Sequence, residues 1–113
     1  MHPKATPGLV FGLLHDKELE NFAADLARQL NARMPPAALS AERASDPKFK
    51  TALAKSLHHV FLGAQNYCRD HKVGLLKRAR FSKTFQDEIK SLGYPDDFVK
   101  EVTMSLAEQL TQI

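Results

Sequence analysis

The chain has 113 residues, 43% of them hydrophobic, which is enough apolar material for one globular domain with one core. Its single cysteine excludes an internal disulfide and favours a reducing compartment, and no run approaches the roughly 18 apolar residues that cross a bilayer. A formal net charge of +3 excludes a strongly basic or strongly acidic protein. We therefore expect a cytoplasmic protein without a membrane span.

The first residues show no periodic pattern. Residues 1–8 contain two prolines and are expected to form a flexible tail, so that residues 9–113 form a single helical domain. The apolar run Leu9–Leu14 is interrupted by Gly12 and is too short for the hydrophobic part of a signal peptide. It fits either a short helix capped by Thr6 or an apolar strap over the core. The pattern leaves open whether it packs within its own chain.

A first strong helix follows Asp16. This residue is a typical N-cap, and the acids at 18 and 20 suit the positive end of a helix dipole. The apolar face recurs at helical spacing in Leu19, Phe22, Ala23, Leu26 and Leu30. Pro35 and Pro36 end this helix, and a weak signal around Leu39 predicts one short helix after them.

The longest helical signal runs from Asp46 to Lys72. Asp46 is a good N-cap, and Pro47 suits the first helical position, where its missing N–H costs nothing. Its apolar face comprises Phe49, Leu53, Leu57, Val60, Phe61, Ala64, Tyr67 and Cys68. At 1.5 Å per residue this helix is about 40 Å long. We expect the other elements to pack around it, with Phe61 in the middle of its buried face, and Gly74 to supply the left-handed residue that ends it.

Two more helices are expected after Gly74. Leu75 and Leu76 begin a segment in which Phe81, Phe85, Ile89 and Leu92 keep a helical stripe, either as one helix or with a break near Phe81.

Gly93 is a candidate C-terminal glycine, and Pro95 with Asp96 and Asp97 opens the last helix. Short connections at residues 73–74 and 93–94 predict that their flanking helices are neighbours in space. The fold class expected is all-α, a compact helical bundle of four main helices plus one or two short ones.

The histidines and the cysteine do not form a convincing metal site. Cys68 and His71 are three residues apart, but a structural zinc site needs about four converging ligands. His58 and His59 point about 100° apart on a helix, so they cannot chelate together. Cys68 lies on the stripe predicted to be buried, which favours an inert thiol. The sequence shows no phosphate loop, paired catalytic carboxylates or nucleophile elbow, so neither an enzyme nor a cofactor is expected.

Positive charge is concentrated between residues 69 and 83. This stretch holds six basic residues and one acid, Asp70, for a local charge of +5, whereas the remaining chain has ten basic and twelve acidic residues. The candidate interaction patch consists of Arg69, Lys72, Lys77, Arg78, Arg80 and Lys83. Such a cluster suits the phosphates of a nucleic acid, or the rim of a protein interface.

A helix-turn-helix around Gly93 is disfavoured. Its recognition helix would begin with Asp96 and Asp97 and continue with Glu101, which would face phosphate where base contacts are expected. Binding of phosphates through the basic cluster is kept as the alternative function. It ranks below a protein interface because no exposed aromatic series for base stacking is evident.

The order of these signals resembles the N-terminal helical domain of the COMM-domain-containing proteins over roughly residues 17–106. The shared features are Asp46-Pro47-Lys48-Phe49 opening a long helix, the basic His71-Lys72-Val73 at its end, and a Leu92-Gly93-Tyr94-Pro95 corner that matches the family's leucine-glycine-x-proline. The stretch from Leu75 to Arg80 is longer than in the family pattern, and the sequence has no COMM domain and no tryptophan.

The resemblance implies a non-enzymatic adaptor in multi-protein complexes, of the kind linked to endosomal sorting and ubiquitin-ligase regulation. It carries over no catalytic residue. A protein–protein interaction module is thus the expected function, with a protein partner favoured over a nucleic acid and the oligomeric state left open.

Overall fold

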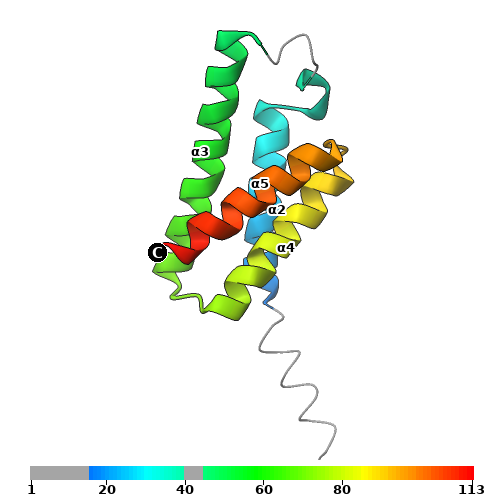
Figure 1. Ribbon diagram of the computed structural model, residues 1–113. Helices are drawn as coiled ribbons and strands as arrows, with labels where there is room; N and C mark the ends of the chain where they lie inside the picture. The colour runs from blue at the N-terminus through cyan, green and yellow to red at the C-terminus, as the bar shows by residue number, and fades with distance from the viewer. Residues whose placement is uncertain (1–15, 40–44) are drawn as a thin grey trace, which may run out of the picture.

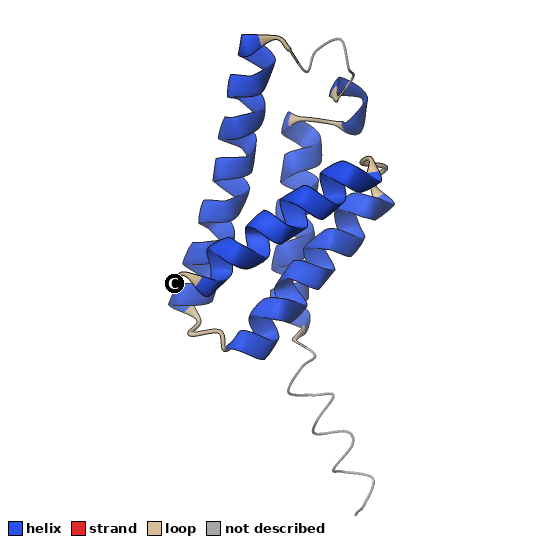
Figure 2. Ribbon diagram, in the orientation of Figure 1, coloured by secondary structure: helices blue, strands red, loops and turns tan. Residues whose placement is uncertain are grey.

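The computed structural model describes residues 16–39 and 45–113, which form four α-helices and one short 3-10 helix. In chain order these are α2 (Lys17–Arg33), η1 (Pro36–Ala38), α3 (Pro47–Asp70), α4 (Leu75–Ser91) and α5 (Asp96–Thr111) (Figure 1). The described residues contain no strand (Figure 2), which confirms the all-α bundle. The tail expected at residues 1–8 and the apolar run Leu9–Leu14 lie outside the described residues.

The helices are arranged in a ring in which each one packs on two others. Helix α2 packs on α4 and α3, and α5 packs on the same two helices. In Figure 1, α5 crosses in front and α2 lies behind. Helices α4 and α5 are therefore neighbours, as their short connection predicts. Helices α3 and α4 lie diagonally across the bundle instead of side by side, so that prediction was wrong. The four-residue connection between them spans the end of the bundle, where it turns the chain without aligning the helices.

Two side-chain caps begin the helices as the sequence predicts. The Asp16 carboxylate accepts a hydrogen bond from the Leu19 N–H at 3.1 Å, and the Asp46 carboxylate accepts one from the Lys48 N–H at 3.0 Å. Each cap satisfies a backbone donor that the helix itself leaves free. Helix α4 has no such side-chain cap, because Gly74 is its N-cap residue. It is one continuous helix, without the break considered near Phe81.

Helices α3 and α4 end in the same hydrogen-bonding pattern. The Val73 N–H bonds the Cys68 carbonyl at 2.9 Å, and the Tyr94 N–H bonds the Ile89 carbonyl at 3.3 Å. This is the Schellman motif, which needs one residue with positive φ. Gly93 fills that position after α4 with a φ of 98°. After α3 the residue is Lys72, with a φ of 50°, so the expectation that Gly74 would do so was wrong. Gly74 has an extended backbone (φ −75°) and begins the next helix.

The core lies between α2, α4 and α5, with the second half of α3 closing its side. Its largest fully buried side chains are Phe81 and Phe85 of α4. Phe61 of α3 is only partly buried and packs against the core from its edge, so the expectation that it lies in the middle of the buried face of this helix was wrong. The buried side chains of α3 lie between Ser56 and Cys68, in its second half. The longest helix, α3, therefore closes one side of the bundle and does not lie at its centre.

Candidate interaction surface

The basic cluster predicted from the sequence is divided among several separate contacts. The Lys77 ammonium lies 3.3 Å from the Asp16 carboxylate, and the Arg80 guanidinium lies 3.3 Å from the Glu20 carboxylate. Both ion pairs join α4 to α2. Lys83 pairs with Asp87 one turn further along α4, at 3.0 Å. Three of the six positive charges therefore have a carboxylate beside them, which reduces the field they present to a phosphate.

Arg78 holds the end of the bundle together. Its Nε donates to the Val73 carbonyl at 2.8 Å, and its Nη1 donates to the carbonyls of Leu110 (2.8 Å) and Ile113 (3.3 Å). The guanidinium thus ties the α3–α4 connection to the C-terminal end of α5, where unpaired carbonyls carry partial negative charge. Arg78 is therefore a structural residue rather than part of an open basic patch.

The two remaining members of the cluster, Arg69 and Lys72, are exposed. The Arg69 guanidinium donates to the side-chain carbonyl of Asn66 at 3.1 Å, which leaves its charge uncompensated. Lys72 has no ion pair with any acid that the structure describes. The positions of the positive charges are visible in the sequence, but the pairing of Lys77 and Arg80 depends on acids about sixty residues earlier in the chain.

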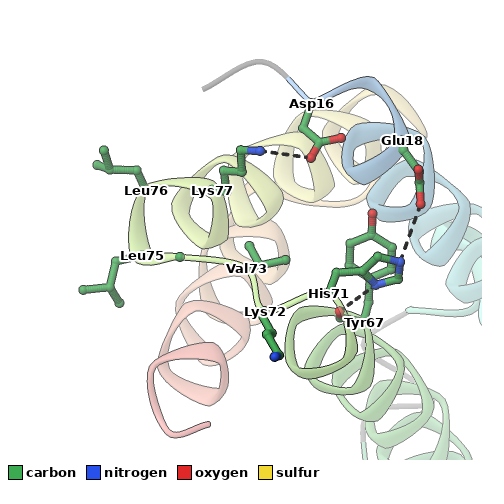
Figure 3. Close-up of a pocket in the computed structure, with 10 residues that line it drawn as sticks. Asp16, Glu18, Tyr67, His71, Lys72, Val73, Leu75, Leu76 and Lys77 are labelled. Atoms are coloured by element: carbon green, nitrogen blue, oxygen red, sulfur yellow. Dashed lines mark hydrogen bonds and ion pairs between the residues drawn. The ribbon is translucent and has the colours of Figure 1, made fainter. Parts of the chain in front are cut away.

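The turn between α3 and α4 exposes two adjacent leucines. Leu75 is 70% exposed and Leu76 is 72% exposed, although the neighbouring Val73 is buried. Figure 3 shows both side chains directed away from the side chains of Asp16 and Tyr67. Few large apolar side chains of the described residues are exposed at all, and only these two are adjacent in sequence. We refer to residues 71–77 as the α3–α4 corner.

A hollow of about 610 Å³ lies at this corner. Its lining combines apolar and charged side chains from three places: the start of α2, the end of α3 and the start of α4. The lining residues are Asp16, Glu18, Tyr67, His71, Lys72, Val73, Gly74, Leu75, Leu76 and Lys77. The hollow therefore has an apolar side next to the leucines and a carboxylate-bearing side on α2.

A stack of rings supports the hollow. Tyr67 lies between Phe22 and His71, with ring centroids 4.5 Å and 4.1 Å from its own. Nδ1 of His71 lies 3.0 Å from the Tyr67 carbonyl oxygen, and its Nε2 lies 3.6 Å from the Glu18 carboxylate (Figure 3). These contacts fix the imidazole at the surface beside Lys72. Burial raises the pKa of the Tyr67 hydroxyl above its ordinary value of 10.0.

The described residues do not gather three or more histidine, cysteine, aspartate or glutamate side chains at a metal-binding distance. Cys68 is fully buried in the core, and burial raises the pKa of its thiol against the opposing effect of the Arg78 guanidinium. His71 is exposed, so the two residues that suggested a metal face different environments. No helix in the described part of the chain is long and apolar enough to cross a membrane.

Sequence reasoning missed the exposed leucines, because Leu75 and Leu76 were interpreted only as the beginning of a helix. Leu76 is five residues before Phe81, which places it about 140° from Phe81 on the helix. The apolar stripe of α4 continues from Phe81 through Phe85 and Ile89, all fully buried. The angular position of Leu76 relative to this buried stripe was therefore the signal in the sequence that would have predicted its exposure.

Comparison with protein-family models, with curated proteins and with solved structures returns no match for this chain. Its function is therefore argued from the surface described above.

Proposed function

We propose that this chain is a non-enzymatic protein-interaction module, an adaptor or regulatory domain of a multi-protein complex in the cytoplasm. The α3–α4 corner is the surface on which its partner binds. The resemblance to the helical domain of COMM-domain-containing proteins supports the same role, including a place in endosomal sorting or ubiquitin-ligase regulation.

The observation that carries this proposal is the exposure of Leu75 and Leu76. Burying a leucine side chain is worth about 1.5–3 kcal/mol, so covering two that are each about 70% exposed contributes roughly 2–4 kcal/mol. A contiguous apolar patch with polar residues at its rim is a common feature of interaction sites. Here the surrounding residues include Lys72 and Lys77.

The side chains at the α3–α4 corner indicate which groups the partner would present. An apolar side chain from the partner enters the hollow beside the two leucines and acts as the central anchor, as in most protein interfaces. A carboxylate of the partner faces Lys72, whose ammonium has no ion pair with a described acid. Rim charges of this kind mainly raise the association rate and select the partner.

The test compares two exposed apolar sites. Nuclease-treated cell extract is passed over the wild-type chain, and the captured protein is then purified and titrated against three forms of the chain. The double variant Leu75→Ser/Leu76→Ser is expected to weaken its affinity at least tenfold. The matched control is Met104→Ser on α5, where the side chain is 62% exposed, and it is expected to change the affinity less than twofold.

All three forms are expected to melt at nearly the same temperature, because both sites are exposed. Equal affinity of the captured protein for the wild type and the leucine variant would overturn the proposal. So would a dimer of this chain, seen by sedimentation and lost in the leucine variant, because the corner would then bind a second copy instead of another protein.

A further inference from the structure

Helix α3 carries four basic residues, and its only acid is Asp70 at its last position. From Pro47 to Arg69 the sequence has four basic residues and no aspartate or glutamate. The first turn also lacks the acids that often occur at a helix N-terminus. This contrasts with α4, where three of the cations named above have carboxylate partners.

Three of these cations lie in one row. Lys48, Lys55 and Arg69 are separated by multiples of seven residues, with Leu62 at the intervening position, and seven residues are close to two helical turns. They therefore share one face, with steps of about 10.5 Å along an axis of about 31 Å. All four side chains are exposed. We call Lys48, Lys55 and Arg69 the α3 ridge.

The ridge charges are available. Lys48 and Lys55 form no ion pair with any acid in the described part of the chain, and Arg69 bonds only the neutral Asn66. A shallow hollow of about 390 Å³ lies along the first two turns, lined by Pro47, Lys48, Thr51, Ala52 and Lys55. The small side chains of Thr51 and Ala52 leave room between the two lysines.

We infer that the α3 ridge binds the phosphate backbone of nucleic acid without reading its sequence. Backbone binding requires only cations free to replace condensed counterions, and the ridge supplies three. A protein partner would need an apolar or aromatic anchor at the centre of its interface. The ridge offers only Leu62, which is 44% exposed, so charge is its main feature. This inference concerns a different surface from the α3–α4 corner and does not depend on the function proposed for it.

The test is a fluorescence-anisotropy titration of a labelled 20-base-pair DNA duplex of arbitrary sequence. Three phosphate contacts predict a slope of about −2.7 for the logarithm of the association constant against the logarithm of salt concentration. Affinity should then fall about 40-fold between 50 mM and 200 mM salt. The ridge variant Lys48→Gln/Lys55→Gln/Arg69→Gln should bring that slope close to zero.

The matched control removes the same number of charges elsewhere. The variant Lys77→Gln/Arg80→Gln/Lys83→Gln also lowers the formal net charge from +3 to zero, but it removes cations that are already paired. It should keep most of the wild-type slope. Circular dichroism at the titration temperature checks that both variants are helical. If the control is unfolded, the double variant Lys48→Gln/Lys55→Gln is compared with the wild type instead. It should reduce the salt slope by about two-thirds, in proportion to the phosphate contacts removed.

Equal loss of affinity in the ridge and control variants would overturn the inference, because net charge alone would then govern binding. Absence of duplex binding at 50 mM salt would overturn it as well. A poly-glutamate chain that binds the wild type more tightly than the duplex, and loses affinity in the ridge variant, would show that the ridge recognises acidic protein instead.

Discussion

The hydroxyl of Tyr94 donates a 2.6 Å hydrogen bond to the backbone carbonyl of Met34, sixty residues earlier in the chain. Tyr94 follows the glycine that ends α4, and Met34 is the C-cap residue of α2. Both residues are buried, and the Tyr94 ring stacks on Phe98 of α5 with a centroid distance of 5.1 Å. One side chain thus links the α4–α5 turn to the end of α2.

Tyr94→Phe removes the donor and leaves the buried Met34 carbonyl without its partner, which costs about 1–3 kcal/mol in the free energy of unfolding. Tyr67→Phe is the matched control. The Tyr67 hydroxyl makes no hydrogen bond to the described residues, so its removal should change the free energy of unfolding by less than about 0.5 kcal/mol. Urea denaturation measures both. Equal effects of the two substitutions would show that the Tyr94 bond contributes nothing specific.

The aromatic residues of the core should differ sharply in importance. Phe85 is fully buried, so Phe85→Ala is expected to cost about 3–5 kcal/mol, a large part of the stability of a domain this size. Phe61 is partly buried, and Phe61→Ala should cost about half as much or less. Thermal melting of the two variants gives the comparison. A lower melting temperature for Phe61→Ala than for Phe85→Ala would place the core on α3 after all.

Cys68 should behave as a buried thiol. It is fully buried, and burial raises its pKa, so little thiolate forms at neutral pH. A disulfide reagent should modify it at least a hundredfold more slowly in the native protein than in denaturant. Zinc is not expected to raise the melting temperature. Rapid labelling of the native protein would indicate an accessible thiolate and would reopen the question of chemistry at this residue.

Most features that depend on residues near one another in sequence could be predicted, although the left-handed residue that ends α3 is Lys72 and not Gly74. Features set by the assembled bundle were harder to predict, and only the packing of α4 on α5 followed from their short connection. The caps at Asp16 and Asp46 and the positive φ of Gly93 each depend on a few neighbouring residues. The diagonal placement of α3 and α4 depends on how all four helices pack. The same holds for the ion pairs of Lys77 and Arg80.

The candidate site follows the same rule. The positions of the charges are visible in the sequence, but their availability depends on partners from other helices. Arg78 appeared as one cation among six, yet it holds three backbone carbonyls. A row of cations without ion pairs to the described acids lies instead on α3, and the lack of acids between Pro47 and Arg69 is visible once charge is counted helix by helix.

Lys72 should be replaceable by glycine with a gain in stability. The left-handed backbone of Lys72 costs a residue with a side chain about 1–2 kcal/mol, and glycine would not pay this cost. Glycine loses more conformational entropy on folding, however, which offsets about 0.5–1 kcal/mol of the gain. Lys72→Gly should therefore stabilise the protein by about 0.5–1 kcal/mol. Gly93→Ala is the opposite test, because an added Cβ meets nothing within 4 Å and the cost of about 1–2 kcal/mol is conformational. A loss of stability in Lys72→Gly would show that its side chain contributes more than its backbone strain removes.

Asp16 should make stability depend on pH in the acid range. The pKa of Asp16 lies below its ordinary value of 3.8, mainly because its carboxylate accepts a hydrogen bond from the Leu19 N–H. The ammonium of Lys77 lowers this pKa further, although burial opposes both effects. The folded state therefore binds fewer protons at this group than the unfolded state. Its contribution is complete above pH 3.8 and is lost as the pH falls through the lower, folded pKa.

Asp16→Asn keeps a capping oxygen for the Leu19 N–H but removes the charge. The wild type should be more stable than this variant at pH 6, and the difference in urea midpoint should shrink steadily below pH 3.8. Lys77→Gln removes one of the groups that lower the pKa of Asp16 and should retain part of the pH dependence, because the hydrogen bond from the Leu19 N–H remains. A difference between wild type and Asp16→Asn that stays constant from pH 6 to pH 2.5 would mean that the carboxylate has the same proton affinity in the folded and unfolded chains. The ion pair between Asp16 and Lys77 would then contribute nothing to the stability of the bundle.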